Sequence, residues 1–496
     1  MYSSLHLIFS LLLFSCVNCL NDPNIIIIGA GAAGIAAATR LYQNGFKNIT
    51  ILEAENRIGG RIYSHQFGEA YIDLGAQWCH GQENNIVYEL VKDLKILRDD
   101  EGTVRLYHSK LKLIDEQFSM KLIDIFENTY GNESNNERGS LGEYLIKRYN
   151  EEIRAAWKND VNKLALAEDC LDVFRKWVET YEASFSWYNI AASSTYEVCG
   201  GKLMLGWNGL GYKTILDVMM QKFPDSKSPI PIDDRIILNK EVEKVLWAST
   251  DRTEIKCADG TNYSCDHVIW TPSLGVLKHG YKTLFEPQLP IEKINAIKAF
   301  GMDAISKIIL HFPKRWWNDD FEGIMFAWDP SDLQRSGGAF LEGPQKEGKS
   351  WITALSSIIP VPKCPNLLSA WFGGEFVPDI EKSSDETIIN GIMYTLQTFL
   401  SVDYPNISLP NKIIRKNWYT DPHFRGTYSF ETVESRKLDK PQGEIISEPL
   451  LSEEGKPAIL FAGEVTNPIH YSTVHGAIES GLREADRLIN FYKHSK

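Results

Sequence analysis

The first regular pattern in the chain is a continuous apolar run from Ile25 to Ile28, directly followed by the glycine-rich stretch Gly29–Gly34. Four β-branched residues in a row are typical of a strand buried on both faces of a parallel sheet. Apolar residues at helical spacing then run from Ile35 to Asn44, and a second strand is expected from Asn48 to Leu52. The pattern therefore predicts a strand–helix–strand unit near the start of the folded chain.

Later segments alternate between helical and strand patterns. Helical spacing dominates from about Asp100 to Asn208, with amphipathic helices expected over Leu141–Arg148 and Cys170–Tyr181. Strands are expected over residues 235–247, 254–257, 267–269, 306–312, 323–328 and 351–356. The last segment predicts a strand over 459–462, a loop of small residues and a long helix ending near Tyr492. Together these patterns indicate a mixed α/β (α+β) fold.

The charge balance narrows the class of partner. Lys and Arg number 52 against 65 Asp and Glu, which gives a formal net charge of −13. Binding to a nucleic-acid backbone relies on clustered Lys and Arg, so no nucleic-acid partner is expected, whereas a cationic ligand is compatible with this charge. A chain of 496 residues can shape a deep pocket. No apolar run reaches the roughly 18 residues of a membrane-spanning helix, so no stable membrane span is predicted.

The amino-terminal segment has the pattern of a secretory signal. Leu7–Val17 is apolar, and small residues precede a possible cleavage site after Cys19. We expect a cleaved signal peptide over residues 1–19 and a secreted or secretory-pathway protein; the alternative is a short hydrophobic anchor. N-glycosylation is expected at those Asn-x-Ser/Thr sites that are exposed, among Asn48, Asn132, Asn262 and Asn406.

Six cysteines follow the predicted signal peptide: Cys79, Cys170, Cys199, Cys257, Cys265 and Cys364. Cys257 and Cys265 flank an Asp-Gly hairpin turn, so either a disulfide across that hairpin or buried free thiols are expected. The six residues lack metal-ligand spacing such as Cys-x-x-Cys, and no metal site is predicted.

The stretch Gly29–Gly34 has the G-x-G-x-x-G spacing of a dinucleotide-binding turn, and it stands between a predicted strand and a predicted helix. Glycines in this turn let the backbone approach a diphosphate at the helix N-terminus. Glu53 lies 19 positions after Gly34, where a carboxylate can accept hydrogen bonds from the adenosine ribose. Arg57 and Arg61 follow, and both are expected to meet the negative diphosphate.

Motifs at both ends of the chain resemble the flavin-containing amine oxidase family, whose cofactor is FAD. The first is Glu53 to Arg61 (ExxxRIGGR) with Asp73 to Trp78 (DLGAQW); the others are Thr271–Leu277, Phe461–Glu464 and Tyr471–Ala477. The resemblance spans essentially the whole chain after the signal peptide. The FAD-binding residues that it implies are Gly29, Gly31, Ala33, Gly34, Glu53, Arg61, Gln77, Trp78, Val242, Trp418, Gly463, Glu464, Thr473 and Val474.

The resemblance also implies two interleaved domains. One is a Rossmann-like FAD-binding domain, discontinuous over residues 20–100, 235–305 and 435–496. The other is a substrate-binding domain of mixed sheet and helices, discontinuous over residues 101–234 and 306–434.

Lys307 stands out in the predicted strand because the alternation places it on the face of Ile305 and Ile309. A lysine there either reaches solvent from a strand edge or is held in a pocket. The resemblance favours the pocket, since the family's lysine at this position holds a water at flavin N5. Burial would lower the pKa of Lys307.

Two positions bear on the kind of amine oxidase. Monoamine oxidases attach FAD through a Cys that precedes a Tyr, whereas this chain has Thr427 before Tyr428, which implies non-covalent FAD. Those enzymes also hold the amine between two aromatic rings; Tyr428 supplies one, and Thr473 stands where the second would lie. A passage with one aromatic wall suits a thin, flexible chain better than an aryl amine.

His80 resembles a His that animal spermine and acetylpolyamine oxidases carry beside the substrate. Residues 425–429 and 471–477 also look most like polyamine oxidases, although His423 stands where the family usually has Tyr. The resemblance implies Lys307, His80 and Tyr428 as catalytic residues and His80, Tyr428 and Thr473 as substrate contacts.

We therefore expect an FAD-dependent polyamine oxidase that acts on spermine, spermidine or acetylated forms. Hydride transfer to flavin N5 and reoxidation by O₂ would give H₂O₂, an aldehyde and a shorter amine. The alternatives are a secreted L-amino-acid oxidase, a monoamine oxidase-like enzyme and a catalytically silent polyamine-binding flavoprotein. The sequence carries no signal for a particular oligomeric state or for which C–N bond is cleaved.

Overall fold

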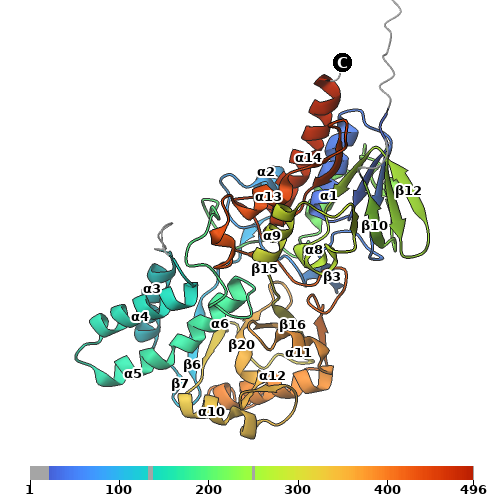
Figure 1. Cartoon of the computed structure of the whole chain (residues 1–496). Coiled ribbons are helices and arrows are strands. Elements are labelled where there is room, and N and C mark those ends of the chain that lie inside the picture. Colours follow the sequence, from blue (N-terminus) through green and yellow to red (C-terminus); the bar gives the residue numbers. More distant parts are fainter. Residues whose placement is uncertain (1–21, 132–137, 248–251, 495–496) are drawn as a thin grey trace, which may run out of the picture.

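The computed structural model describes residues 22–131, 138–247 and 252–494 (Figure 1). The predicted signal peptide and the glycosylation site at Asn132 lie outside the described residues. Asn48, Asn262 and Asn406 are exposed, as glycosylation would require. Among the helices of the described ranges, none is both long enough and apolar enough to cross a membrane.

A six-stranded sheet draws on the start, the middle and the end of the chain. Its order is β24 (Leu450–Leu451), β25 (Pro457–Phe461), β13 (His267–Trp270), β1 (Ile25–Ile28), β2 (Ile49–Leu52) and β9 (Ile236–Ile237). All neighbours are parallel except β24 and β25. All four residues of β1 are buried, as expected of a central parallel strand.

Helices α1 (Ala32–Gln43) and α14 (Val474–His494) pack against each other beside this sheet (Figure 1). They approach closely at Gly481, where a Cβ atom would overlap the carbonyl oxygen of Ala33. The nearby helices are α2 (Ile86–Val91), α7 (Thr214–Met219), α8 (Leu274–Gly280), α9 (Ile291–Ala299) and α13 (Gln442–Ser447). A four-stranded sheet adds β12 (Asn262–Cys265), β11 (Thr253–Cys257), β10 (Val242–Leu246) and β14 (Phe285–Glu286).

A seven-stranded sheet forms the other half of the molecule (Figure 1). Its order is β22 (Lys412–Arg415), β16 (Ser306–His311), β21 (Leu367–Phe372), β20 (Leu355–Pro360), β17 (Gly323–Ala327), β6 (Val104–His108) and β7 (Lys112–Leu113). Its helices are α3 (Glu116–Gly131), α4 (Leu141–Ala156), α5 (Val161–Asp169), α6 (Leu171–Tyr181), α10 (Pro330–Ala339), α11 (Val377–Lys382) and α12 (Asp385–Leu400).

Short two-stranded pairs complete the fold. They are β3 (Ser64–Phe67) with β4 (Ala70–Asp73), β5 (Arg98–Asp99) with β8 (Leu205–Gly206), β15 (Gly301–Met302) with β23 (Ser429–Phe430), and β18 (Gln345–Lys346) with β19 (Lys349–Ser350). The mixed α/β class predicted from the sequence is confirmed.

Two predicted strands are wrong in their extent. The segment 235–247 divides into β9 and β10, which belong to different sheets. Between them the chain turns at Asn239, with φ 54°, and the backbone N–H groups of Asn239 and Lys240 donate to Glu55 and Glu53. The segment 351–356 begins as a 3₁₀ helix, Trp351–Ala354, in which the indole of Trp351 donates to the carbonyl of Glu342. In the first place the displacing hydrogen bonds come from a distant segment, and in the second the bond is local.

The disulfide considered between Cys257 and Cys265 is absent, and the six described cysteines are free and buried. The hairpin register explains why, because Cys265 stands opposite Thr253 at one end of the pair. Cys257 lies at the other end, where β11 meets the turn. The alternative of buried free thiols is confirmed.

Candidate active site

The carboxyl ends of the parallel strands bring the nucleotide motifs to one edge of the six-stranded sheet. The backbone N–H of Gly29 donates to Leu52, that of Thr271 donates to Ile28, and that of Ala462 donates to Trp270. Four segments therefore lie side by side where adjacent strands end: the glycine-rich turn, Glu53, the Thr271 segment and Gly463–Glu464. Ligands of open parallel sheets bind in this position.

Each glycine of the first turn has a different reason to lack a side chain. Gly29 has φ 101°, and a Cβ on Gly34 would overlap the carbonyl oxygen of Gly29. A Cβ on Gly31, by contrast, would meet nothing nearer than the carbonyl oxygen of Gly59 at 3.9 Å. Gly31 is also the N-cap of α1, and no side chain caps that helix. Open space in front of an uncapped helix N-terminus is what a diphosphate requires, so these residues fit FAD.

Glu53 is buried, and its carboxylate is hydrogen-bonded to the backbone of this turn. Its Oε2 accepts a hydrogen bond from the N–H of Ala30 at 2.7 Å, and its Oε1 accepts one from Glu55 at 2.8 Å. Burial raises the pKa of Glu53. Val242, the expected adenine contact, is half-buried in β10, next to a register shift in the pairing of β10 with β11.

The two arginines that follow Glu53 have separate roles. Arg61 donates from Nη1 to the carbonyl of Thr427 at 2.9 Å and to Oε1 of Glu464 at 2.8 Å. Arg57 instead donates to backbone carbonyls of its own loop, among them Gly60 at 2.8 Å. The contact expected between these two guanidinium groups and the diphosphate stays a prediction.

Glu464 is buried and has protein partners on both oxygens. Besides Arg61, it accepts hydrogen bonds from the hydroxyl of Ser429 at 2.6 Å and the N–H of Ser472 at 2.8 Å. Gly463, with φ 114°, donates its N–H to Ser480 at 2.8 Å. Thus Glu464 ties the end of β25 to the loop that carries Thr427 and Tyr428.

Lys307 is 3% exposed, so the pocket predicted for it is confirmed and the solvent-exposed strand edge is excluded. Its ammonium donates to the carbonyls of Asp73 at 2.8 Å and Gly75 at 2.9 Å, and to Oε1 of Gln77 at 2.9 Å. Burial lowers the pKa of Lys307 to about 7, although the carboxylate of Asp73 favours its charged form. Lys307 can therefore hold or lose a proton near neutral pH.

Aromatic side chains surround this lysine. Its Nζ lies 4.6 Å from the ring centre of Trp371, which stacks on Trp78 at 5.7 Å and 15°. The indole N–H groups of both tryptophans are buried and have no partner among the described residues. Trp418 lies nearby, and its indole donates to Leu74 at 3.2 Å.

Tyr428 belongs to the same apolar cluster as Trp78, Trp371, Ala183 and Ile305. Its hydroxyl donates to the carbonyls of Thr180 at 3.0 Å and Tyr181 at 3.2 Å. Burial raises the pKa of Tyr428, so the hydroxyl keeps its proton. These contacts fix the ring as one wall of the site.

His80 is held in one tautomer. Its Nδ1 lies 2.7 Å from the carbonyl of Leu203 and must donate to it, which leaves Nε2 as an acceptor. Burial lowers the pKa of His80, so the ring is neutral at pH 7. The ring lies edge-on to Trp78, with centroids 6.5 Å apart. A neutral imidazole with a free acceptor can take a proton from an ammonium group.

Thr473 and Val474 stand at the start of α14. The hydroxyl of Thr473 accepts from the N–H of Gly476 at 3.0 Å and donates to the carbonyl of His470 at 2.7 Å. The hydroxyl of Thr473 is therefore bonded to backbone groups at the start of the helix. Both residues are half-buried. Their expected contacts with the flavin stay a prediction.

A buried cluster of Cys199, His470 and His475 was not indicated by spacing in the sequence. The thiol of Cys199 lies 3.6 Å from Nε2 of His475 and 3.9 Å from Nε2 of His470. Glu479 accepts a hydrogen bond from Nδ1 of His470. The amide oxygen of Asn85 caps α2, so its amide nitrogen is the group that donates to Nδ1 of His475. Nδ1 of His475 is then an acceptor and Nε2 carries the proton, so neither ring nitrogen offers a lone pair to a metal ion. Cys199, His470, His475, Glu479 and Asn85 form one hydrogen-bonded chain.

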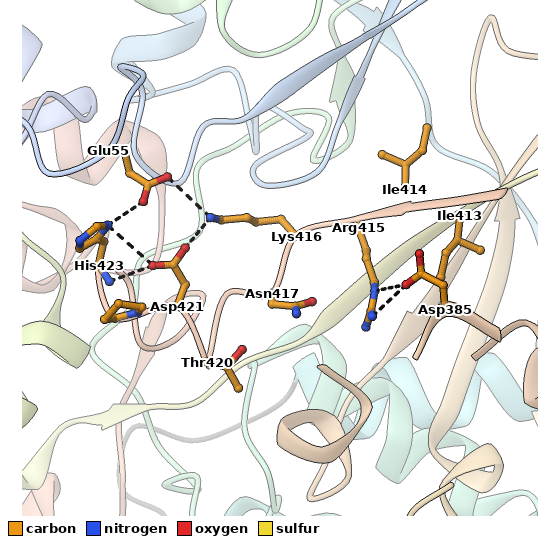
Figure 2. A pocket seen from close by; sticks show the side chains of 11 residues that line it. Glu55, Asp385, Ile413, Ile414, Arg415, Lys416, Asn417, Thr420, Asp421 and His423 are labelled. Atoms are coloured by element: carbon orange, nitrogen blue, oxygen red, sulfur yellow. Dashed lines mark hydrogen bonds and ion pairs between the residues drawn. The ribbon is translucent and has the colours of Figure 1, made fainter. Parts of the chain in front are cut away.

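His423 lies in an ion cluster near the end of β2. Figure 2 shows it facing Glu55 and Asp421, with Lys416 bonded to both carboxylates. The cluster lines an open cleft of about 730 Å³. Burial lowers the pKa of His423, but the hydrogen bond to Glu55 and the charges of Asp421 and Glu241 outweigh it and raise the pKa overall. His423, which stands where the family usually has Tyr, thus belongs to this ion cluster.

Comparisons with known proteins agree with the geometry. The family model "Flavin containing amine oxidoreductase" matches residues 32–489. The chain is 28% identical to "Probable polyamine oxidase 5" of Arabidopsis thaliana, covering 95% of this chain and 98% of that protein. It is also 28% identical to "Peroxisomal N(1)-acetyl-spermine/spermidine oxidase" of Homo sapiens, covering 95% of each. A solved structure of a redesigned putrescine oxidase shares the fold, with a TM-score of 0.65, 16% identity and 94% and 99% coverage.

Proposed function

Since the chain belongs to the flavin-containing amine oxidoreductase family and its cofactor is FAD, we propose that it oxidises aliphatic polyamines such as spermine, spermidine or their acetylated forms. The observation that carries this proposal is the neutral His80 beside the wall formed by Tyr428 and the paired indoles of Trp78 and Trp371. Several polyamine oxidases stand among the relatives, which supports the same substrate class.

Bound FAD supplies a hydride acceptor for the carbon next to a secondary amine and then a donor of two electrons to O₂, giving H₂O₂. The residues of this chain do the remaining work. Nε2 of His80 accepts a proton from the substrate, so that the reacting amine is neutral. Tyr428 packs against the alkyl chain, and its fixed hydroxyl limits how the chain can turn. Trp78 and Trp371 exclude water, while Lys307 presents an ammonium to the charge that O₂ gains.

The residues that hold FAD would be the glycine-rich turn, Glu53, Arg61 and the segment from Gly463 to Val474. We propose that this attachment is non-covalent, because Thr427 offers no thiol. The backbone of Thr427 accepts from Arg61, and its hydroxyl accepts from the N–H of Ile305 at 3.3 Å.

Non-covalent binding predicts that acid or heat denaturation releases the flavin. After precipitation of the purified protein, the yellow chromophore should remain in the supernatant, where absorbance and fluorescence measure it. Flavin that stays with the washed pellet would show a covalent bond and refute this part of the proposal.

The alternatives are less well supported by the site. An L-amino-acid oxidase needs a cation for the α-carboxylate, whereas the ammonium of Lys307 already donates to the carbonyls of Asp73 and Gly75. A monoamine oxidase-like site would place a second aromatic ring opposite Tyr428, where this chain has Thr473. A silent flavoprotein has no need of a buried lysine with a pKa near 7.

A peroxide-coupled assay on the purified yellow protein tests the substrate class. The panel is spermine, spermidine, N-acetylspermine, tyramine and L-leucine at equal concentration. We expect turnover of the polyamines; turnover of L-leucine alone or tyramine alone would replace the proposal by the corresponding alternative.

A further inference from the structure

Lys307 has a buried ammonium whose direct partners carry no charge. They are the carbonyls of Asp73 at 2.8 Å and Gly75 at 2.9 Å and the amide oxygen of Gln77 at 2.9 Å. Within the described part of the chain, no carboxylate comes close enough to Nζ to form an ion pair. Neutral acceptors offset only part of the cost of burying a charge. A charged group nearby therefore has a large influence on whether Nζ keeps its proton.

Asp73 supplies a carboxylate close to this ammonium. Because its backbone carbonyl contacts Nζ of Lys307, its carboxyl carbon lies within about 8 Å of the same atom. The carboxylate oxygens accept hydrogen bonds from the hydroxyl of Ser64 and from the N–H of Tyr212, the latter at 3.0 and 3.2 Å. Both of these donors are neutral. The carboxylate therefore keeps its charge available to Lys307.

The carboxylate and the ammonium stabilise each other's charge. Burial raises the pKa of Asp73 to about 6, and the charge of Lys307 acts against this rise. Burial lowers the pKa of Lys307 to about 7, and the charge of Asp73 acts against this fall. Opposite charges at this distance interact strongly where water is excluded, so removing either charge moves the titration of the other group.

A cavity of about 50 Å³ adjoins both groups. Asp73 and Gln77 are part of its lining, and Ser369 adds a third polar side chain. A polar cavity of this size has room for water. Protons can therefore reach the two groups although Lys307 itself is 3% exposed, and both can titrate in the folded protein.

We propose that Asp73 is a positioning residue for the reaction with O₂: its carboxylate keeps Lys307 in the ammonium form at neutral pH and thereby sets the pH range in which the reduced flavin is reoxidised. The inference rests on the role proposed for Lys307 and adds a second charged residue to it. Because Asp73 acts through Lys307, it needs no contact with the substrate. Its removal should shift a pH profile instead of slowing the reaction at every pH.

Asp73→Asn removes the charge and keeps the backbone carbonyl and an oxygen that accepts from Ser64. The midpoint of the reoxidation rate should move down by about 1–2 pH units, because an opposite charge nearby changes a pKa by about that amount. The rate at pH 7 should then fall about 5- to 50-fold, whereas at pH 5 it should lie within about threefold of the wild type. Asp439→Asn, which removes an exposed carboxylate, is the matched control and should leave the profile unchanged.

The rate would be measured by mixing dithionite-reduced holoenzyme with O₂ in a stopped-flow spectrophotometer. Dithionite supplies the electrons, so the result does not depend on which amine is the substrate, and failure of the polyamine proposal would leave this test intact. Flavin content and thermal denaturation establish that each variant is folded. If Asp73→Asn does not fold, Ser64→Ala keeps Asp73 but removes a donor from its carboxylate, and should move the midpoint in the same direction by less.

The double variant Asp73→Asn, Lys307→Met tests whether Asp73 acts through the lysine. It should be reoxidised as slowly as Lys307→Met alone at every pH, because no ammonium remains to be affected. A further loss of more than about threefold at pH 7 would overturn the inference, and so would an unchanged midpoint in the folded single variants.

An NMR titration measures the protonation of Lys307 directly. In holoenzyme labelled with ¹³C-lysine, the resonance that is missing from Lys307→Met belongs to Lys307, and its shift with pH gives the pKa. A midpoint at least about one pH unit lower in Asp73→Asn than in the wild type supports the inference. Equal midpoints would overturn it.

Discussion

Replacing Lys307 with Met should slow the reaction of the reduced enzyme with O₂ by about 100-fold, the usual loss when one preorganised charge or donor is removed from a reaction centre. Lys307 is buried, and its ammonium is held by Asp73, Gly75 and Gln77. Its charge stabilises the electrons that O₂ accepts. Stopped-flow mixing of the anaerobically reduced protein with O₂ measures this step separately from substrate oxidation.

The pKa of Lys307, about 7, adds a signature that a packing defect would not produce. Below that pH the ammonium is present, and above it the charge is lost, so the wild-type reoxidation rate should fall as pH rises through about 7. Lys307→Met should be slow at every pH, without this transition. A variant that is folded, carries its flavin and reacts with O₂ at the wild-type rate would remove the role given to Lys307.

Replacing Gly31 with Ala should weaken FAD binding by about 100-fold, or about 2.7 kcal/mol, while the protein stays folded. A Cβ at this position meets only the oxygen of Gly59 at 3.9 Å, so the fold has room for it. That same space lies before the uncapped N-terminus of α1, where the diphosphate must approach the backbone. Titration of the apoprotein with FAD, followed by flavin fluorescence, gives the dissociation constant.

Gly34→Ala is the informative contrast to Gly31→Ala. There the Cβ would overlap the carbonyl of Gly29 and force α1 away from β1, so this variant should lose stability rather than flavin affinity alone. Thermal denaturation distinguishes the two effects. If Gly31→Ala binds FAD as tightly as the wild type, the diphosphate does not lie at this helix.

Features encoded locally were predictable from the sequence. The buried strand at Ile25–Ile28 and the turn that follows it depend on spacing along one segment, which the sequence pattern reports directly. The alternation placed Lys307 on one face of its strand, and only the resemblance favoured a pocket for it. The fold class and the flavin motifs were therefore accessible before the structure was known.

Features assembled by tertiary contacts were not predictable. The hairpin turn between Cys257 and Cys265 was visible, but only the register shows the two thiols at opposite ends of the pair. Cys199 meets His475 across 276 positions in sequence, so no local spacing marks that cluster.

The central claim is that a polyamine is the reducing substrate, and anaerobic reduction by spermine tests it most directly. The oxygen-free holoenzyme would be mixed with spermine in a stopped-flow spectrophotometer, with L-leucine and tyramine in parallel, while the absorbance of oxidised flavin is followed. Rapid, complete bleaching by spermine is the result that the proposed function predicts. Flavin that stays oxidised with spermine but bleaches with L-leucine or tyramine would contradict it.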